Sequence, residues 1–119
     1  MFKLRIGYLI STIITGLILF ISFINSMPDG KLHIVFCDVG QGDAIYIKFP
    51  SGSDMLVDGG ANSRVIGCLS RYMPFWDRKI DMVALTHPQA DHMIGLVEVL
   101  TRYGVPFFIK SDIKTLKIV

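Results

Sequence analysis

The stretch Ile80-Asp81-Met82-Val83-Ala84-Leu85-Thr86-His87-Pro88-Gln89-Ala90-Asp91-His92 decides the fold and carries most of the chemistry in this sequence. Its first half is an apolar run typical of a buried strand. Its second half predicts a polar loop that leads into a helix from Met93 to about Tyr103, with Gly104 as the C-cap. Two imidazoles and a carboxylate follow the strand closely enough to meet at one point, and both groups bind zinc or manganese.

The flanking segments predict a small sheet covered by helices. Apolar, β-branched runs predict strands at 32–37, 44–49, 54–58, 80–86 and 106–109, with a hairpin turn at 50–53. A helix is expected at about 63–73, capped by Asn62, with one apolar face formed by Val65, Ile66, Leu69 and Tyr72. Three strands in a meander, then helix, strand, helix and strand, indicate an α/β (α+β) fold.

The N-terminal segment is apolar enough to cross a membrane. No charged residue lies between Arg5 and Asp29, and the run at 6–24 approaches the ~20 residues that span a bilayer as a helix. No Ala-x-Ala-like cleavage site follows, so an uncleaved anchor is favoured over a cleaved signal peptide. Lys3 and Arg5 place the N-terminus in the cytoplasm and the rest of the chain outside. We therefore expect a membrane anchor at 1–28 and a domain at 29–119.

The composition limits the functions of that domain. The net charge of +2 is too small to indicate nucleic-acid binding by itself, and the part outside the apolar run can bury only a small core. Cys37 and Cys68 show neither C-x-x-C nor zinc-finger spacing. Buried free thiols are the favoured interpretation of both cysteines. A disulfide, which an extracytoplasmic location permits, is the alternative.

Three ordered motifs carry a family resemblance. The segment 86–96, THPQADHMIGL, resembles the His-x-His-x-Asp-His motif of the metallo-β-lactamase superfamily. The segment 36–44, FCDVGQGDA, resembles the signature of one branch, the hydrolase domain of ComEC-type DNA-uptake (competence) proteins, and 56–60, LVDGG, matches a further motif of that branch. The resemblance covers about 32–103. It implies that the anchor is followed by the first half of an αββα metallo-β-lactamase sandwich.

The same resemblance implies a site and an activity. His87 would be a ligand of one metal, while Asp91 and His92 would hold a second. Asp58 would orient a metal ligand without binding the metal itself. Asp91 and Asp58 are therefore the candidate catalytic carboxylates. In two-metal hydrolases a bound water becomes a nucleophile at neutral pH. The implied protein is a metal-dependent hydrolase that acts on DNA or another phosphodiester.

Two departures from the family pattern leave activity open. Gln89 stands where the motif's second histidine is expected and offers at most a weak amide ligand, and no histidine follows His92. The family's remaining ligands come from its later part, so we expect weak binding of zinc or manganese unless a separate chain supplies the second half. The alternatives are a non-catalytic remnant and a membrane-tethered interaction module. Half a sandwich also leaves one sheet face uncovered, so the domain alone is expected to aggregate, dimerise or stay partly unfolded.

Overall fold

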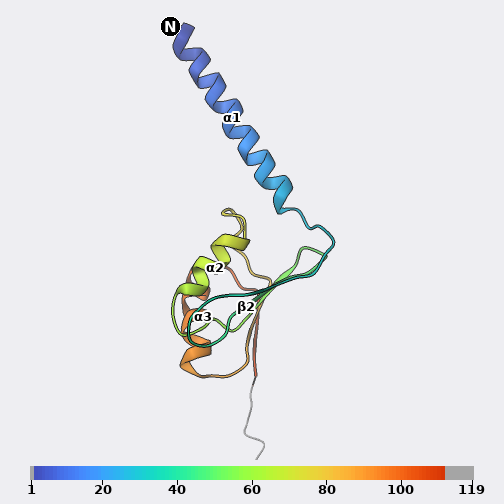
Figure 1. Ribbon diagram of the computed structural model, residues 1–119, viewed down its shortest axis with the longest axis vertical. Coiled ribbons are helices and arrows are strands. Elements are labelled where there is room, and N and C mark those ends of the chain that lie inside the picture. The colour runs from blue at the N-terminus through green and yellow to red at the C-terminus, as the bar shows by residue number, and fades with distance from the viewer. Residues whose placement is uncertain (1, 112–119) are drawn as a thin grey trace, which may run out of the picture.

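The computed structural model describes residues 2–111, in which a long N-terminal helix leads to a sheet with two helices (Figure 1). Residues 112–119 of the expected domain lie outside the described residues. The elements are α1 (Phe2–Ser26), β1 (His33–Phe36), β2 (Ile45–Lys48), β3 (Asp54–Val57), α2 (Arg64–Tyr72), β4 (Met82–Leu85), α3 (Ala90–Arg102) and β5 (Phe107–Lys110). The expected mixed α+β class is confirmed.

The strands form one five-stranded sheet in sequence order, β1-β2-β3-β4-β5. The first three strands pair antiparallel as the expected meander. The β2–β3 turn is closed by the Phe49 amide, which donates to the Ser53 carbonyl at 2.8 Å, and it contains Gly52 at a φ of +93°. The helices α2 and α3 then make the crossovers that parallel pairing of β3, β4 and β5 requires.

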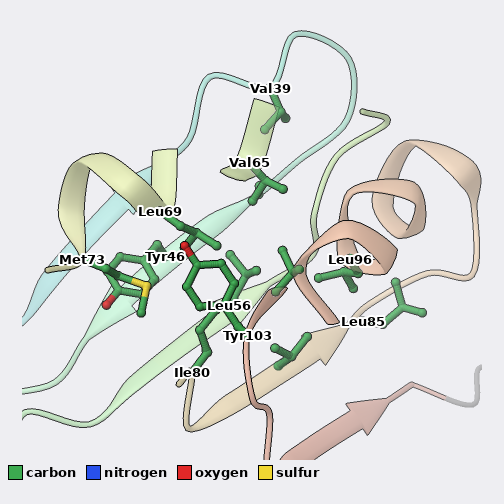
Figure 2. Packing of buried hydrophobic residues seen from close by; sticks show 13 residues of the cluster. Val39, Tyr46, Leu56, Val65, Leu69, Met73, Ile80, Leu85, Leu96 and Tyr103 are labelled. Carbon is green, nitrogen blue, oxygen red and sulfur yellow. The ribbon is translucent and has the colours of Figure 1, made fainter. Parts of the chain in front are cut away.

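The core lies between one face of this sheet and the two short helices (Figure 2). The sheet contributes Tyr46, Leu56, Val83 and Leu85, and the helices contribute Val65, Leu69, Leu96 and Val99, all of them buried. The apolar face expected for α2 is therefore confirmed at Val65 and Leu69. It is wrong at Tyr72, whose side chain is 49% exposed because it falls at the end of the helix, past the edge of the packed layer.

No element of residues 2–111 covers the opposite face of the sheet. Register and alternation place apolar residues from all five strands on it. We call it the open face, and its members are Ile34, Phe36, Ile45, Ile47, Met55, Val57, Met82, Ala84, Phe107 and Ile109. Exposure is largest at the edge strands, reaching 76% at Phe36 and 64% at Phe107.

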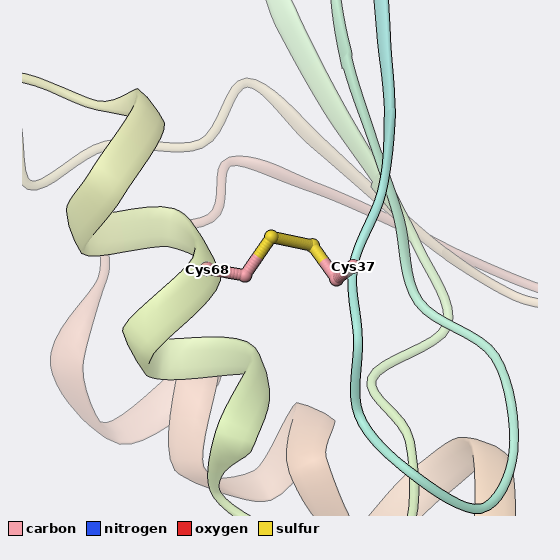
Figure 3. The surroundings of a disulfide bond; sticks show 2 residues. All are labelled: Cys37 and Cys68. Atoms are coloured by element: carbon pink, nitrogen blue, oxygen red, sulfur yellow. A yellow bond between two sulfur atoms is a disulfide. The ribbon is translucent and has the colours of Figure 1, made fainter.

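The two cysteines form a disulfide, so the expectation of free thiols is wrong (Figure 3). Cys37 follows β1 and Cys68 lies in the middle of α2, with their Cα atoms 5.8 Å apart. That separation is typical of bridged cysteines. Their sequence separation of 31 positions carries no spacing signal. Only the packing of α2 against the end of β1 brings the two side chains together.

The first helix is long and apolar enough to cross a membrane over Arg5–Ser26, with a mean hydropathy of 2.2. This range contains the span expected from the sequence. The helix extends away from the sheet and gives the molecule a long dimension of 82 Å (Figure 1). Its side chains contribute nothing to the core, which is the arrangement expected of a helix whose apolar surface faces lipid rather than protein.

Candidate functional site

The candidate site lies where β3 and β4 end and α3 begins. Because β3 and β4 are parallel, their carboxyl ends meet at one edge of the sheet. Asp58 directly follows β3, and Thr86 and His87 directly follow β4. The Asp58 amide donates to the Ala84 carbonyl at 2.8 Å, which fixes the two strand ends side by side.

Asp58 is a buried carboxylate held from several directions. It is 3% exposed and has a φ of +59°, an uncommon conformation for a residue with a side chain. Its carboxylate accepts the Thr86 amide at 2.8 Å, the Thr86 hydroxyl, and the Nδ1 of His92 at 3.0 Å. A neutral His92 that donates from Nδ1 keeps its Nε2 lone pair free for a ligand. Asp58 is therefore in contact with Nδ1 of His92, and its role in orienting a metal ligand stays a prediction.

The remaining residues expected in the site cluster around His92. The Nε2 of His92 lies 3.7 Å from an Asp91 carboxylate oxygen. The rings of His87 and His92 lie with their centroids 5.5 Å apart, and the Nδ1 of His87 is 3.1 Å from the Thr86 hydroxyl. The His92 side chain is only 15% exposed, whereas His87 is open to solvent.

The start of α3 differs from the expected boundary. The helix begins at Ala90, so Asp91 and His92 lie in its first turn rather than in the preceding loop. Gln89 is the N-cap residue, and its carbonyl accepts the amides of His92 and Met93, each at 3.0 Å. An acidic residue in the first turn also suits the positive end of the helix dipole. The Gln89 side chain is exposed and makes no capping hydrogen bond.

The other end of α3 also differs. Tyr103 is the C-cap, in an extended conformation, and its amide donates to the Val99 carbonyl. Gly104 was expected to be the cap and instead forms a bridge with Lys79. The amide of Gly104 donates to the Arg78 carbonyl at 2.8 Å. The chain after α3 therefore pairs at once with the segment that precedes β4.

Glycines bring two loops into contact with the start of α3. A Cβ on Gly95 would lie 1.7 Å from the Gly59 carbonyl oxygen, and a Cβ on Gly42 would lie 1.8 Å from the Asp91 carbonyl oxygen. The Gly59 amide donates to the His92 carbonyl at 2.9 Å. The loops at 38–43 and 58–60 are therefore seated on the first turn of α3. The sequence motifs that contain Asp43, Asp58 and His92 meet at one place.

Two contributors to the site were not expected from the sequence. Thr86 links Asp58 to His87 through its hydroxyl, and Gly95 permits the approach of α3 to the loop after β3. The only sequence signal for Thr86 is its place between an apolar strand and a histidine. Gly95 looks like an ordinary helix interruption until the neighbouring backbone is known.

The donor set is suited to a divalent metal but is incomplete. Catalytic zinc sites have three protein ligands to one metal. Within residues 2–111, no group of three His, Cys, Asp or Glu side chains is arranged to hold a metal ion. His87, Asp91 and His92 are close together, but they do not by themselves form a complete coordination site.

Comparisons with known proteins give a likeness in fold and no family. No family model matches the chain, and no curated protein matches it. A solved structure described as the peroxy diiron species of the chemotaxis sensor ODP is similar, with a TM-score of 0.51 and 24% sequence identity. The match covers 68% of this chain and 35% of that one, so the chain spans about a third of the length of its structural neighbour. This likeness supports the fold.

Proposed function

We propose that this chain is the membrane-anchored, extracytoplasmic first half of a metallo-β-lactamase-type, metal-dependent hydrolase that acts on DNA or another phosphodiester. The observation that carries the proposal is the Asp58–His92 pair. A buried carboxylate that fixes Nδ1 of a histidine and leaves Nε2 free is the usual support of a metal-binding imidazole.

The meeting of the three motifs supports the same proposal. Each motif could occur by chance in an unrelated loop, but here the segments 36–44, 56–60 and 86–96 contact one another at the carboxyl ends of parallel strands. Ligand sites in sheets of this kind gather at that edge. His87, Asp91 and His92 are the proposed metal ligands, and Gln89 is a weak one at most.

The open face supports the second half of the proposed fold. Sheet-on-sheet packing in a sandwich buries one apolar face of each sheet, and the open face has the apolar composition for this role across all five strands. We propose that polypeptide outside the described residues, in the same or a separate chain, supplies the second sheet and the missing ligands.

The proposed location has two supports. Lys3 precedes the candidate span and Arg5 is its first residue, and these two charges favour a cytoplasmic N-terminus. The Cys37–Cys68 disulfide lies on the other side of that span, and disulfides persist in oxidising compartments outside the cytoplasm. Charge and redox chemistry therefore favour the same orientation.

The alternative is a membrane-tethered interaction module, or a remnant without catalysis. The observation in its favour is the absence, within residues 2–111, of a three-ligand group. In that case Asp58 and His92 would serve only to join β3, β4 and α3, and metal affinity would not depend on them.

Metal binding by the full chain in detergent micelles separates these readings. Calorimetry with zinc, manganese and iron is appropriate, iron because the structural neighbour is described as a diiron species. We expect weak binding that His92→Ala abolishes and that Asp58→Asn weakens by about 10- to 100-fold. Gln89→His should tighten it, since an imidazole replaces an amide oxygen.

His33→Ala is the matched control for loss of an imidazole. His33 pairs with Asp29 at 2.8 Å, away from the site, so its loss should leave metal affinity unchanged. Equal affinity in the wild-type chain and His92→Ala would place any bound metal elsewhere. No binding by either the wild-type chain or Gln89→His would refute the metal proposal and leave the interaction module.

A further inference from the structure

A pair of exposed aromatic residues lies beside the outer end of α1. Phe75 and Trp76 belong to the loop that joins α2 to β4, and their rings form an edge-to-face pair with centroids 5.0 Å apart. Phe75 is 70% exposed and Trp76 is 41% exposed. In Figure 1 this loop turns toward the end of α1 that leads into the sheet. Large exposed aromatics of this kind mark a surface that contacts another apolar phase.

The depth of Phe75 and Trp76 relative to a bilayer follows from the α1 residues beside them. One cleft is lined by Leu19 and Phe23 of α1 together with Phe75 and Trp76. The candidate span ends at Ser26, so at about 1.5 Å of rise per residue Phe23 lies roughly 5 Å and Leu19 roughly 10 Å inside that end. The whole span of 22 residues is about 33 Å long, which is close to the ~30 Å of a hydrocarbon core. Side chains that share a cleft with Leu19 therefore reach the lipid level.

The polar groups beside this loop agree with that depth. A second cleft joins Phe75 and Trp76 to Ser22 and Asn25 of α1 and to Arg71 of α2. The apolar cleft thus continues into a polar one toward the end of the span. Tryptophan rings collect at the boundary between lipid tails and headgroups, and an arginine at this level can bind a lipid phosphate.

We propose that the loop at 74–79 inserts Phe75 and Trp76 into the outer interface of the bilayer and so fixes the orientation of the domain on the membrane. This inference rests on the proposed role of α1 as a membrane anchor. The occupant of the aromatic surface is the lipid interface, because the same clefts continue along the apolar surface of α1. The domain then has two attachments to the membrane, which prevents it from turning freely about the linker at 27–32.

Trp76 is the single tryptophan of the chain, so its fluorescence reports on this loop alone. The full chain is reconstituted into vesicles of phosphatidylcholine with some phosphatidylglycerol, with or without bromine on the acyl chains. We expect the brominated lipid to remove most of the Trp76 emission. Emission that is the same in both kinds of vesicle would overturn the proposal.

Two variants in a Trp76→Phe background make the result specific. Phe20→Trp reports on α1, where the side chain is 61% exposed, and it should be quenched if α1 is inserted. Val97→Trp reports on the exposed side of α3, where Val97 is 56% exposed, and it should not be quenched.

The variants separate the failure of the loop from the failure of the anchor. Quenching of Phe20→Trp without quenching of Trp76 would overturn the loop proposal and keep the anchor. No quenching at either position would overturn both. Quenching of Val97→Trp as strong as that of Trp76 would show that the whole domain lies on the bilayer, and it would also overturn a specific role for the loop.

Discussion

At the scale of single residues, Gly95 controls how closely α3 approaches the site. A Cβ at this position would lie 1.7 Å from the Gly59 oxygen and 2.8 Å from the Asn62 oxygen, and both are backbone atoms that no rotamer change can move. We expect Gly95→Ala to lower the free energy of unfolding by ~3 kcal/mol, at the upper end of the usual overpacking effect. Urea unfolding followed by circular dichroism measures the loss.

Gly67→Ala is the control for the same chemical change in a helix. Gly67 is exposed on α2, and an added Cβ would meet nothing within 4 Å. Alanine should stabilise this helix by ~0.5–1 kcal/mol. Equal effects of the two substitutions would contradict the close approach of α3 to Gly59.

Asp81 gives the fold a dependence on acid pH. The Asp54 amide donates to the Asp81 carboxylate at 3.0 Å and lowers the pKa of that carboxyl. The Asp81 amide in turn donates to the Asp54 carboxylate, and burial raises the pKa of Asp54. A lowered folded pKa means that the Asp81 contribution is present above the unfolded pKa of ~3.9 and is lost as the pH falls through the folded pKa.

The expected effect of Asp81→Ala is therefore pH-dependent. At pH 7 we expect a loss of ~1 kcal/mol, kept small because the side chain is 40% exposed and solvent screens it. The difference from the wild-type chain should shrink as the pH is lowered below about 4. Denaturant melts at several pH values measure it, and a difference that is constant down to the lowest pH would show that the carboxylate charge has no part in the effect.

The site could be predicted from sequence where a strand end determined it. The loop of His87 was singled out because it follows an apolar strand, whereas Asp58 was singled out by the family resemblance, and the parallel pairing of β3 and β4 brings the two strand ends together. Thr86 and Gly95 could not be predicted, because their roles depend on contacts with residues 28 and 36 positions away. A pattern in one segment does not show which backbone will lie against it.

At the scale of elements, α2 was predicted within one residue at each end, and α3 was not. The expected cap of α2 at Asn62 is wrong, because the N-cap residue is Ser63. In α2, apolar residues at helical spacing continue to both ends of the helix, so the pattern predicts where it begins and where it ends. In α3 the first turn holds Asp91 and His92, so its polarity resembles that of a loop. The N-cap position also lacks the usual Ser, Thr, Asp or Asn. It is occupied by Gln89, which accepts hydrogen bonds through its backbone carbonyl and makes no side-chain cap. The start of this helix therefore lacks the signal of a capping side chain.

The disulfide joins two elements that the sheet does not join. It ties the end of β1 to the middle of α2, at a sequence separation of 31 positions. Closing a loop of that length should contribute ~3–4 kcal/mol. We expect a reducing agent to lower the denaturant midpoint of the wild-type chain and to leave that of a Cys37→Ala/Cys68→Ala double variant unchanged. An identical midpoint with and without reductant in the wild-type chain would contradict the pairing.

At the scale of the whole molecule, the helices protect only one side of the sheet. On the inner face, Tyr46, Leu56, Val83 and Leu85 are buried under α2 and α3, while Phe36 and Phe107 on the open face remain more than half exposed. At ~25 cal/mol per Å2, a few hundred Å2 of apolar surface left in water forfeits several kcal/mol. That amount is comparable to the total stability of a small domain, so the open face needs a cover. An uncovered sheet face was expected from the sequence, because the family resemblance implies half of a sandwich.

The open face predicts how the domain behaves without its anchor. Residues 29–119 should self-associate at micromolar concentration, because two open faces can cover each other. Phe36→Lys and Phe107→Lys place charges on the two edge strands of that face and should shift the distribution toward monomer in sedimentation velocity. Val97→Lys puts the same charge on the exposed side of α3, where the residue is 56% exposed, and should leave association unchanged. A monodisperse wild-type monomer with a cooperative melt would mean that the sheet needs no second layer, and the half-sandwich architecture would then be wrong.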